Sequence, residues 1–196
     1  TTAWDLAKLG YRPVVFEALP VAGGMLRVGI PKYRLPDEII DYEVEAIRRA
    51  GVEIRTDTPV GPDLTLRDLF QQEFKAILVA IGTHKSRRLN IDGEDLEGVH
   101  HSLGFLKNVP PGKLPCSVAD KVVAVIGGGH TAIDAARTAL RLGARESLIV
   151  YRRTRDEMPV TEAELAAAEA EGVMIHYLLA PRTIIGREGK VTGLLC

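Results

Sequence analysis

The sequence predicts an α/β protein built from two consecutive units, each a parallel sheet with helices packed on it. Short apolar runs alternate with segments of helical periodicity, which is the pattern of parallel sheets and their crossover helices. The alternation stops in a stretch rich in proline, glycine and charge and then restarts. We therefore expect a first unit in residues 1–100 and a second in residues 101–196.

The first unit opens with a helical pattern and ends in a wholly apolar run, AILVAIG, which predicts a strand covered on both faces. In the helix after the first loop, Ile40, Val44 and Ile47 share one face. The expected elements are a helix ending at Gly10, a strand at 13–18, a glycine-bearing loop at 20–32, a helix at 35–51, a strand at 52–56, a helix at 65–74 and a strand at 76–82.

The second unit repeats this order after residues 83–121, which we expect to link the two units. Thr161 and Glu164 form a T-x-x-E capping box, and Gly172 ends the helix that follows. The expected elements are a helix at 102–109, strands at 122–127, 147–153 and 173–180, helices at 131–143 and from Thr161, and a hairpin at 183–195.

A glycine motif lies where the strand at 122–127 gives way to a helix. Gly127, Gly129 and Ala132 match G-x-G-x-x-A. The first glycine permits a tight turn, the second lets the backbone approach a pyrophosphate, and the small third residue lets helix and strand pack closely. A glycine turn without a ligand is the alternative. Because strand, loop, helix and strand occur in order, the motif favours a Rossmann-like dinucleotide site.

The end of the next strand indicates which dinucleotide binds. An acid there would hydrogen-bond the ribose of NAD, whereas a 2′-phosphate needs cations. The sequence places Tyr151, Arg152 and Arg153 at this point, with no carboxylate before Asp156. An arginine fork can bind a phosphate, so we favour NADP(H) over solvated arginines without a ligand. At the start of the helix, His130 and Thr131 offer side-chain donors near the phosphates, although a histidine there can also be a simple cap.

At the matching position, the first unit has a negatively charged residue instead of arginines. Glu17 ends the strand at 13–18, which suits an unphosphorylated ribose, as in FAD or NAD. A strand-end glutamate is also common as exposed surface. Gly23 and Gly24 in the next loop support the ligand interpretation, because glycines let a backbone close over a cofactor.

Composition excludes several other classes of function. The 25 basic and 26 acidic residues nearly cancel, so overall charge does not favour nucleic acid. No apolar stretch approaches the ~20 residues of a membrane span, and the N-terminus lacks signal-peptide order, so we expect no membrane insertion and a cytoplasmic protein. The two cysteines, Cys116 and Cys196, form no C-x-x-C, which disfavours thiol exchange, a zinc site and a cluster site.

Three motifs in order resemble one family over essentially the whole chain. The segments FEALPVAGGMLRVGIPKYRLP, AILVAIGTH and VVAVIGGGHTAIDAARTALRLGA with VYRRTRDEMP are similar to the small (beta) subunit of bacterial glutamate synthase and its FAD- and NADPH-binding relatives, including the flavin half of dihydropyrimidine dehydrogenase. The resemblance implies an NADPH domain inserted in an FAD domain. It also implies hydride transfer from NADPH to FAD, with electrons passing to iron-sulfur clusters and a large catalytic or iron-sulfur partner subunit.

The resemblance also implies roles for individual residues. In the first unit it implies that Glu17 holds the FAD ribose and that Gly82 and Thr83 lie beside the flavin. In the second unit the family usually has asparagine at the position of His130. The full set of implied cofactor-binding residues is Glu17, Gly23, Gly24, Met25, Arg34, Val60, Gly82 and Thr83 for FAD, and Gly127, Gly128, Gly129, His130, Thr131, Arg152 and Arg153 for NADPH. No catalytic side chain is expected, because the cofactors supply the chemistry.

Some family features have no counterpart in this sequence. The glycine-rich strand-turn for the FAD pyrophosphate, the C-terminal GD segment and the cysteine-rich cluster domain are missing. We therefore expect an internal fragment with a better-ordered NADPH unit, weak or no FAD binding and little or no activity of its own. The alternative is a noncatalytic NADP(H)-binding module or an inactive fragment. The sequence does not identify the final electron acceptor.

Overall fold

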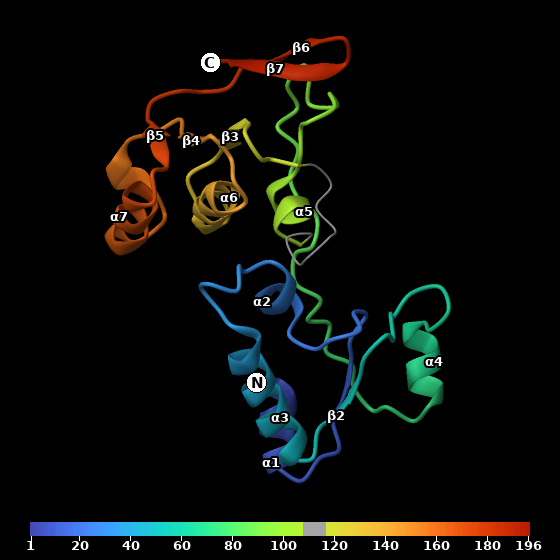
Figure 1. The fold of residues 1–196 in the computed structure, drawn as a ribbon. Helices are drawn as coiled ribbons and strands as arrows, with labels where there is room; N and C mark the ends of the chain where they lie inside the picture. The colour runs from blue at the N-terminus through green and yellow to red at the C-terminus, as the bar shows by residue number, and fades with distance from the viewer. Residues whose placement is uncertain (108–116) are drawn as a thin grey trace. The chain divides into compact units, whose positions relative to one another are not determined.

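The computed structural model describes residues 1–107 and 117–196, which form two compact units, Thr1–Thr83 and His84–Cys196 (Figure 1). Residues 84–100 group with the second unit by their contacts. The assignment of residues 1–100 to one cofactor domain and 101–196 to another stays a prediction. The expected helix positions at 108 and 109, and Cys116, lie outside the described residues.

The first unit contains a two-stranded parallel sheet and four helices. Val14, Val15 and Phe16 pair with Glu53, Ile54 and Arg55. The helix expected at 35–51 is present, and its Ile40 is buried. The observed elements are α1 (Thr2–Lys8), β1 (Val14–Phe16), α2 (Gly24–Val28), α3 (Asp37–Arg49), β2 (Glu53–Arg55) and α4 (Leu66–Gln71).

The strand expected at residues 76–82 is wrong: these residues form no strand in the structure. Leu78, Val79 and Ile81 are 66%, 62% and 78% exposed. A strand needs a neighbour to satisfy its backbone hydrogen bonds, and the sheet of the first unit contains only β1 and β2. The run therefore has the composition of a buried strand without the pairing that would make it one.

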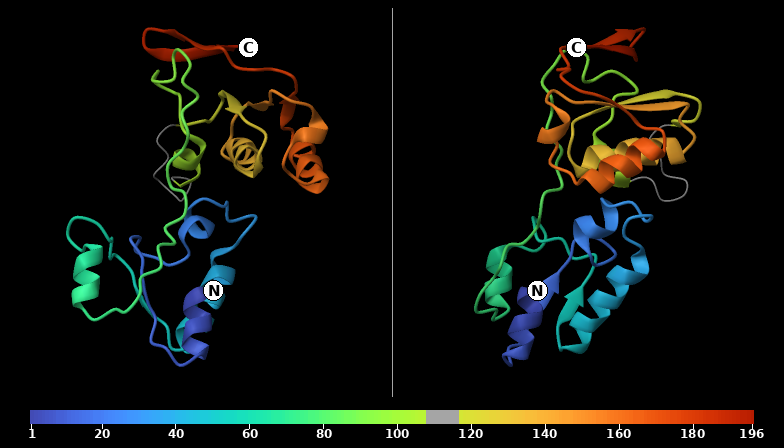
Figure 2. Two further views of the ribbon diagram at one scale, coloured as in Figure 1. Left: turned by 180° about the vertical axis from the view of Figure 1, so that it is seen from behind. Right: turned by 90° about the vertical axis from the view of Figure 1, so that its left-hand side faces the viewer.

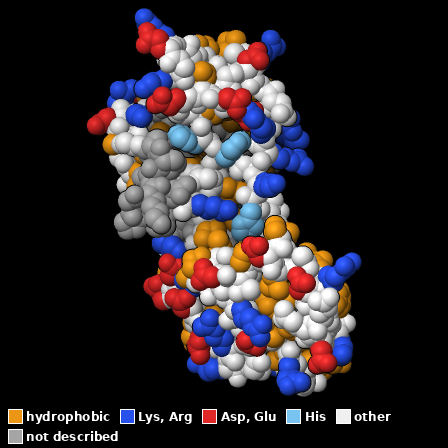
Figure 3. All heavy atoms as spheres, turned by 90° about the vertical axis from the view of Figure 1, so that its right-hand side faces the viewer, with side chains coloured by type: hydrophobic (Ala, Val, Ile, Leu, Met, Phe, Trp, Pro, Cys, Tyr) orange, Lys and Arg blue, Asp and Glu red, His pale blue; other side chains and the backbone are white. Residues whose placement is uncertain are grey.

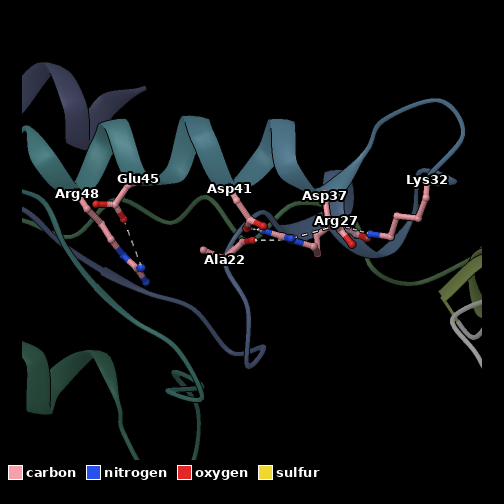
Figure 4. A network of polar contacts seen from close by, with 7 residues as sticks. All are labelled: Ala22, Arg27, Lys32, Asp37, Asp41, Glu45 and Arg48. Carbon is pink, nitrogen blue, oxygen red and sulfur yellow. Dashed lines mark hydrogen bonds and ion pairs between the residues drawn. The ribbon is translucent and has the colours of Figure 1, made fainter.

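A short helix, α2, replaces part of the loop expected at 20–32. Arg27 in α2 reaches Asp37 and Asp41 of α3 and donates to the carbonyl of Ala22 at 3.2 Å (Figure 4). Lys32 forms a further ion pair with Asp37. Ion pairs with Asp41 and Asp37 raise the pKa of Arg27 above its usual value. We call these contacts the Arg27 clamp; they hold the glycine-bearing segment against α3.

The second unit is built on a three-stranded parallel sheet in the order β3–β4–β5. Helix α6 connects β3 to β4, and α7 connects β4 to β5, which is one βαβαβ half of a doubly wound fold. The observed elements are α5 (Ser102–Lys107), β3 (Val122–Ile126), α6 (His130–Arg141), β4 (Glu146–Val150), a 3₁₀ turn η1 (Arg155–Glu157), α7 (Glu162–Ala170), β5 (Met174–His176), β6 (Thr183–Arg187) and β7 (Lys190–Leu195).

The three helices of this unit lie side by side along the sheet β3–β4–β5 (Figures 1 and 2). Ile133 and Ile149 are nearly or fully inaccessible at the centre of the helix–sheet contact. Alanines on α6 allow close approach, since Ala136 and Ala139 are 0% exposed. The one large buried apolar cluster among the described residues belongs to this unit; it runs from Phe105 to Val173.

The hairpin expected at 183–195 is present as β6 and β7. Part of the stretch expected to link the units pairs with it: Ile184 donates to the carbonyl of Asp92 at 2.8 Å, and Val191 donates to that of Glu97 at 2.9 Å. Residues 92–97 are therefore built into the second unit rather than serving only as a linker.

Acidic and basic side chains are interspersed on the face drawn in Figure 3. Across the described residues, no helix has both the length and the apolar character needed to cross a membrane.

Candidate functional site

The candidate site of the second unit lies where its three parallel strands end. Ile126, Val150 and His176 occupy the same register at the carboxyl ends of β3, β4 and β5. The glycine turn follows the first of these residues, and Tyr151 with the two arginines follows the second. The structure therefore brings the glycine motif and the arginines to one edge of one sheet, which is where doubly wound sheets bind ligands.

The glycine turn is closed by backbone contacts. Gly127 has φ +132° and donates to the carbonyl of Val150 at 3.1 Å. A Cβ on Gly128 would lie 2.5 Å from the ring of Tyr151, so this position admits no side chain without movement. A Cβ on Gly129 would meet nothing within 4 Å. The turn is tight on its Gly128 side and open at Gly129, where a ligand can approach.

Tyr151 is a structural residue of the site that sequence reasoning missed. Its ring is buried against Gly128, and its hydroxyl donates to the carbonyl of Glu157 at 2.8 Å. The neighbouring GGG and YRR triplets do not reveal this packing, because it depends on the register between β3 and β4.

Helix α6 begins without a protein cap. Its N-cap, Gly129, offers no side-chain hydrogen bond, and the first turn holds no acidic residue. In α7, by contrast, Thr161 and Glu164 form the full capping box expected from the sequence. The first amides of an uncapped helix are free donors carrying partial positive charge, which is the arrangement that binds phosphate groups.

The arginines near this helix differ in their partners. Among the residues that the structure describes, Arg152 and Arg153 are exposed and make no side-chain hydrogen bond or ion pair. Arg155 is bound to Glu162 and Glu169, and these carboxylates raise its pKa above the usual value. The two arginines expected to hold a 2′-phosphate therefore keep their donors available, whereas Arg155 ties η1 to α7.

His130 and Glu164 form a contact that the sequence did not predict. His130 Nδ1 lies 3.0 Å from Glu164 Oε1, which joins the first turn of α6 to the first turn of α7. The backbone and hydroxyl of Thr161, together with His130, lower the pKa of Glu164 to about 2. Thr131 is exposed in the same first turn.

In the first unit, Glu17 and the segment that contains Val60 lie at the same end of the parallel pair β1–β2. The amide of Thr58 donates to the Glu17 carbonyl at 2.9 Å. The Glu17 carboxylate accepts from the amide of Leu19 at 2.8 Å, so it shapes the turn after β1. Val60 is 43% exposed in the loop that follows.

The glycine-bearing segment after Glu17 has a left-handed start. Gly23 and Gly24 have φ of +125° and +53°, and a Cβ on Gly23 would lie 2.9 Å from Ile40. Met25 belongs to α2, and Arg34 lies in the turn before α3, where its amide donates to the Pro31 carbonyl at 2.9 Å.

Gly82 and Thr83 end the first unit as exposed, irregular chain, and Gly82 has φ +68°. Their expected place beside a flavin stays a prediction. Within residues 1–107 and 117–196, no group of three or more His, Cys, Asp or Glu side chains is placed to hold a metal ion.

Known proteins similar to this chain match almost all of it. The beta subunit of the NADP(+)-dependent formate dehydrogenase of Moorella thermoacetica is 46% identical, over 100% of this chain and 28% of its own length. The NADPH-Fe(3+) oxidoreductase beta subunit of Geobacter sulfurreducens is 40% identical, over 99% and 29%. The glutamate synthase [NADPH] small chain of Escherichia coli is 34% identical, over 96% and 42%. The chain therefore spans less than half the length of these relatives.

Solved structures show the same fold. FprA of Mycobacterium tuberculosis in complex with NADPH aligns with a TM-score of 0.75 at 22% identity, over 91% of this chain and 55% of that one. The thioredoxin reductase of Lactococcus lactis aligns with a TM-score of 0.62 at 18% identity, over 98% and 65%. The predicted α/β class is confirmed by these likenesses and by the parallel sheets.

The relatives also confirm the resemblance drawn from the three motifs, because glutamate synthase small chains and NADPH-dependent beta subunits are both among them. The sequence model of one protein family matches residues 2–195. The chain belongs to the pyridine nucleotide-disulphide oxidoreductase family.

Proposed function

We propose that the second unit binds NADPH and that the chain is the electron-input part of a flavin-dependent oxidoreductase. One observation carries the first half of this proposal. An uncapped helix begins at an open glycine, and two exposed arginines, which make no side-chain hydrogen bond or ion pair among the described residues, follow the adjacent strand. The names of the three relatives above, each of which includes NADP or NADPH, support the same choice of nucleotide.

Each group in this site has a distinct role in the proposal. The amides of the α6 first turn bind the pyrophosphate, and Gly129 leaves room for it. Arg152 and Arg153 bind the 2′-phosphate, for which planar guanidinium groups are suited. Buried Ala132, the third position of the motif, lets α6 begin close to β3.

The first unit fits the adenosine end of FAD. Glu17 has a second carboxylate oxygen to offer a ribose, and a Cβ on Gly24 would meet nothing within 4 Å, which leaves its backbone open to a ligand. Met25, Arg34, Val60, Gly82 and Thr83 complete the set carried over from the resemblance. The Arg27 clamp orients this segment before a ligand arrives.

The chemistry of this proposal needs no catalytic side chain. When bound, NADPH would supply a hydride that FAD would accept, and the residues named above would hold and orient the two cofactors. Disulfide exchange, which the family name covers, needs a redox pair of cysteines. Cys116 and Cys196 are far apart in the sequence and form no C-x-x-C, so we propose electron transfer without a thiol step.

The relatives named as beta subunits or small chains favour a larger partner subunit that receives the electrons. Iron-sulfur clusters belong to that partner or to other parts of the enzyme in this proposal. Such a function implies the cytoplasm, where cysteine thiols stay reduced.

The nucleotide choice is tested by replacing both arginines with alanine, R152A/R153A. We expect NADPH affinity to fall roughly 10- to 100-fold, the scale of losing charge-assisted hydrogen bonds, while NADH affinity stays the same. Calorimetric titration of both nucleotides measures this. R187A is the matched control, because Arg187 is an exposed arginine on β6. Equal losses for NADPH and NADH would contradict the 2′-phosphate assignment.

A second measurement separates an oxidoreductase from a noncatalytic NADP(H)-binding module. With the full-length chain, NADPH and added FAD, we expect slow oxidation of NADPH that depends on both the protein and the flavin. Binding of NADPH without any oxidation above the protein-free rate would favour the binding module.

A further inference from the structure

The contact between His130 and Glu164 sets the direction in which the imidazole can donate. Glu164 Oε1 is 3.0 Å from His130 Nδ1. Its other oxygen, Oε2, accepts from the amide and the hydroxyl of Thr161, both at 2.9 Å. Three contacts thus hold the Glu164 carboxylate at the start of α7, and one of them also holds the His130 imidazole at the start of α6.

An ionised carboxylate has only acceptors, so it requires a proton on Nδ1 of the histidine it contacts. A neutral imidazole that keeps its proton on Nδ1 has a bare lone pair on Nε2. That lone pair would repel a phosphate oxygen. Only the imidazolium form donates from both nitrogens, one to Glu164 and the other outward.

We infer that Glu164 is a positioning residue that makes His130 a proton-dependent ligand of the dinucleotide pyrophosphate, so that nucleotide binding takes up a proton. The inference rests on the proposed function, since it deepens the site at the α6 N-terminus. It is supported by the low pKa of Glu164, about 2, which keeps the carboxylate ionised at all working pH values. The His130 side chain is 55% exposed, so a ligand can reach it.

The other charged groups on the elements packed against α6 have partners of their own. Those on α7 are engaged with arginines, the lysine of α5 contacts a histidine, and β3 carries no charged residue. The groups and partners are Glu162 and Glu169 with Arg155, Glu171 with Arg137 and Arg141, Lys107 with His84, Glu146 of β4 with Arg145, and Asp134, which is buried within α6 itself. Among described residues, Glu164 is the acidic group that contacts His130.

The test is calorimetric titration with NADH in two buffers of different ionisation enthalpy, which counts the protons taken up. NADH is chosen because it lacks the 2′-phosphate, whose second proton would titrate near pH 6. We expect fractional proton uptake at neutral pH. Because only the imidazolium form can donate to both Glu164 and the pyrophosphate, NADH affinity should fall about three- to tenfold from pH 6 to pH 8.

Three variants separate this role from a structural one. H130N and H130Q should abolish proton uptake and flatten the pH profile. E164Q keeps the Thr161 capping box, because glutamine also serves at that position. The substitution removes the demand for a proton on Nδ1, so the pH profile of NADH affinity should also flatten. Relative to wild type, the affinity of E164Q should be lower at pH 6 and unchanged at pH 8. E162Q, which neutralises another glutamate of α7, should retain the wild-type profile.

If NADH binds too weakly to be measured, the same titrations can be made with NADPH. The protons bound by its 2′-phosphate then cancel in the difference between wild type and variant. NADH binding without proton uptake, or uptake unchanged in H130N and H130Q, would overturn the inference while leaving the nucleotide site intact. If neither nucleotide bound the wild-type chain, the proposed function would fail and the inference with it.

Discussion

At the scale of single residues, neighbouring positions of the turn require glycine for different physical reasons. The motif G-x-G-x-x-A assigns roles to Gly127 and Gly129 and none to the residue between them. In the structure, Gly128 is the position with no room, because the Tyr151 ring occupies the space of its Cβ. The sequence could therefore predict the turn but not this contact.

Two alanine substitutions separate packing from ligand approach. G128A places a methyl group 2.5 Å from the Tyr151 ring and should cost about 1–3 kcal/mol in the free energy of unfolding, as overpacking does. G129A enters open space at an extended φ of −90°, so its stability should change by less than about 0.5 kcal/mol. Urea unfolding measures both.

The same two variants should rank in the opposite order for binding. A methyl group at residue 129 lies where the pyrophosphate is proposed to approach, so G129A should weaken NADPH more than tenfold, by roughly the 1.4 kcal/mol or more that this factor represents. An NADPH affinity of G129A equal to that of the wild type would remove Gly129 from the proposed site.

Sequence reasoning also placed Arg152 and Arg153 at the nucleotide edge, because a strand end is readable from an apolar run. It could not tell these arginines from Arg155, which lies two positions further on. Only the positions of Glu162 and Glu169 on α7 show that Arg155 is engaged within the protein.

At the scale of elements, the contact between α6 and α7 makes stability depend on pH. Glu171 beyond α7 accepts from Arg137 at 2.5 Å and from Arg141 at 2.6 Å, and these bonds lower its pKa to about 2 from the ordinary value of 4.5. A carboxylate with a depressed pKa stabilises the fold above its unfolded pKa. That contribution is lost as the pH falls through the folded pKa.

We therefore expect the melting temperature of the wild-type chain to drop between pH 5 and pH 2. E171Q should lower stability near neutral pH by about 1–2 kcal/mol, a discounted figure for a partly exposed group, and should make the acid slope shallower. E188Q is the control, since Glu188 is 85% exposed and 3.8 Å from Arg187. An acid slope identical in E171Q and wild type would contradict the assignment.

The glycine-bearing segment of the first unit gives a second prediction at this scale. R27A removes the clamp to Asp37, Asp41 and the Ala22 carbonyl. Amide exchange in residues 20–36 should accelerate about tenfold, the scale of one or two moderately strong ion pairs. R48A, which loses only a 4.0 Å pair with Glu45 on α3, should leave exchange in this segment unchanged.

Helices with strong local signals could be predicted from the sequence, and short ones could not. The Thr161 capping box and the start of α7 occur where the residue types demand. Helix α2 spans only Gly24–Val28 between glycines, so no periodic face can develop in it. It is held by Arg27 contacts to α3, which no local pattern reveals.

At the scale of the whole chain, two apolar runs that both predict a strand differ in the structure. VVAVI became the first strand of a three-stranded sheet, and AILVAIG formed no strand. Periodicity reports that a segment can be buried, whereas a strand also needs a paired neighbour. The sheet of the first unit offers only β1 and β2, so composition alone could not predict the outcome at residues 76–82.

Matched lysine substitutions test this difference. Val79 is 62% exposed in the unpaired run, whereas Val125 is 7% exposed on β3, opposite Ile149. V79K should change the free energy of unfolding by less than about 0.5 kcal/mol, and it should reduce aggregation because it interrupts an exposed apolar run. V125K buries a charge without a partner, so it should cost more than about 3 kcal/mol and leave little folded protein. Urea unfolding and light scattering measure the two effects, and a loss of stability in V79K comparable to that in V125K would show that residues 76–82 are packed in solution.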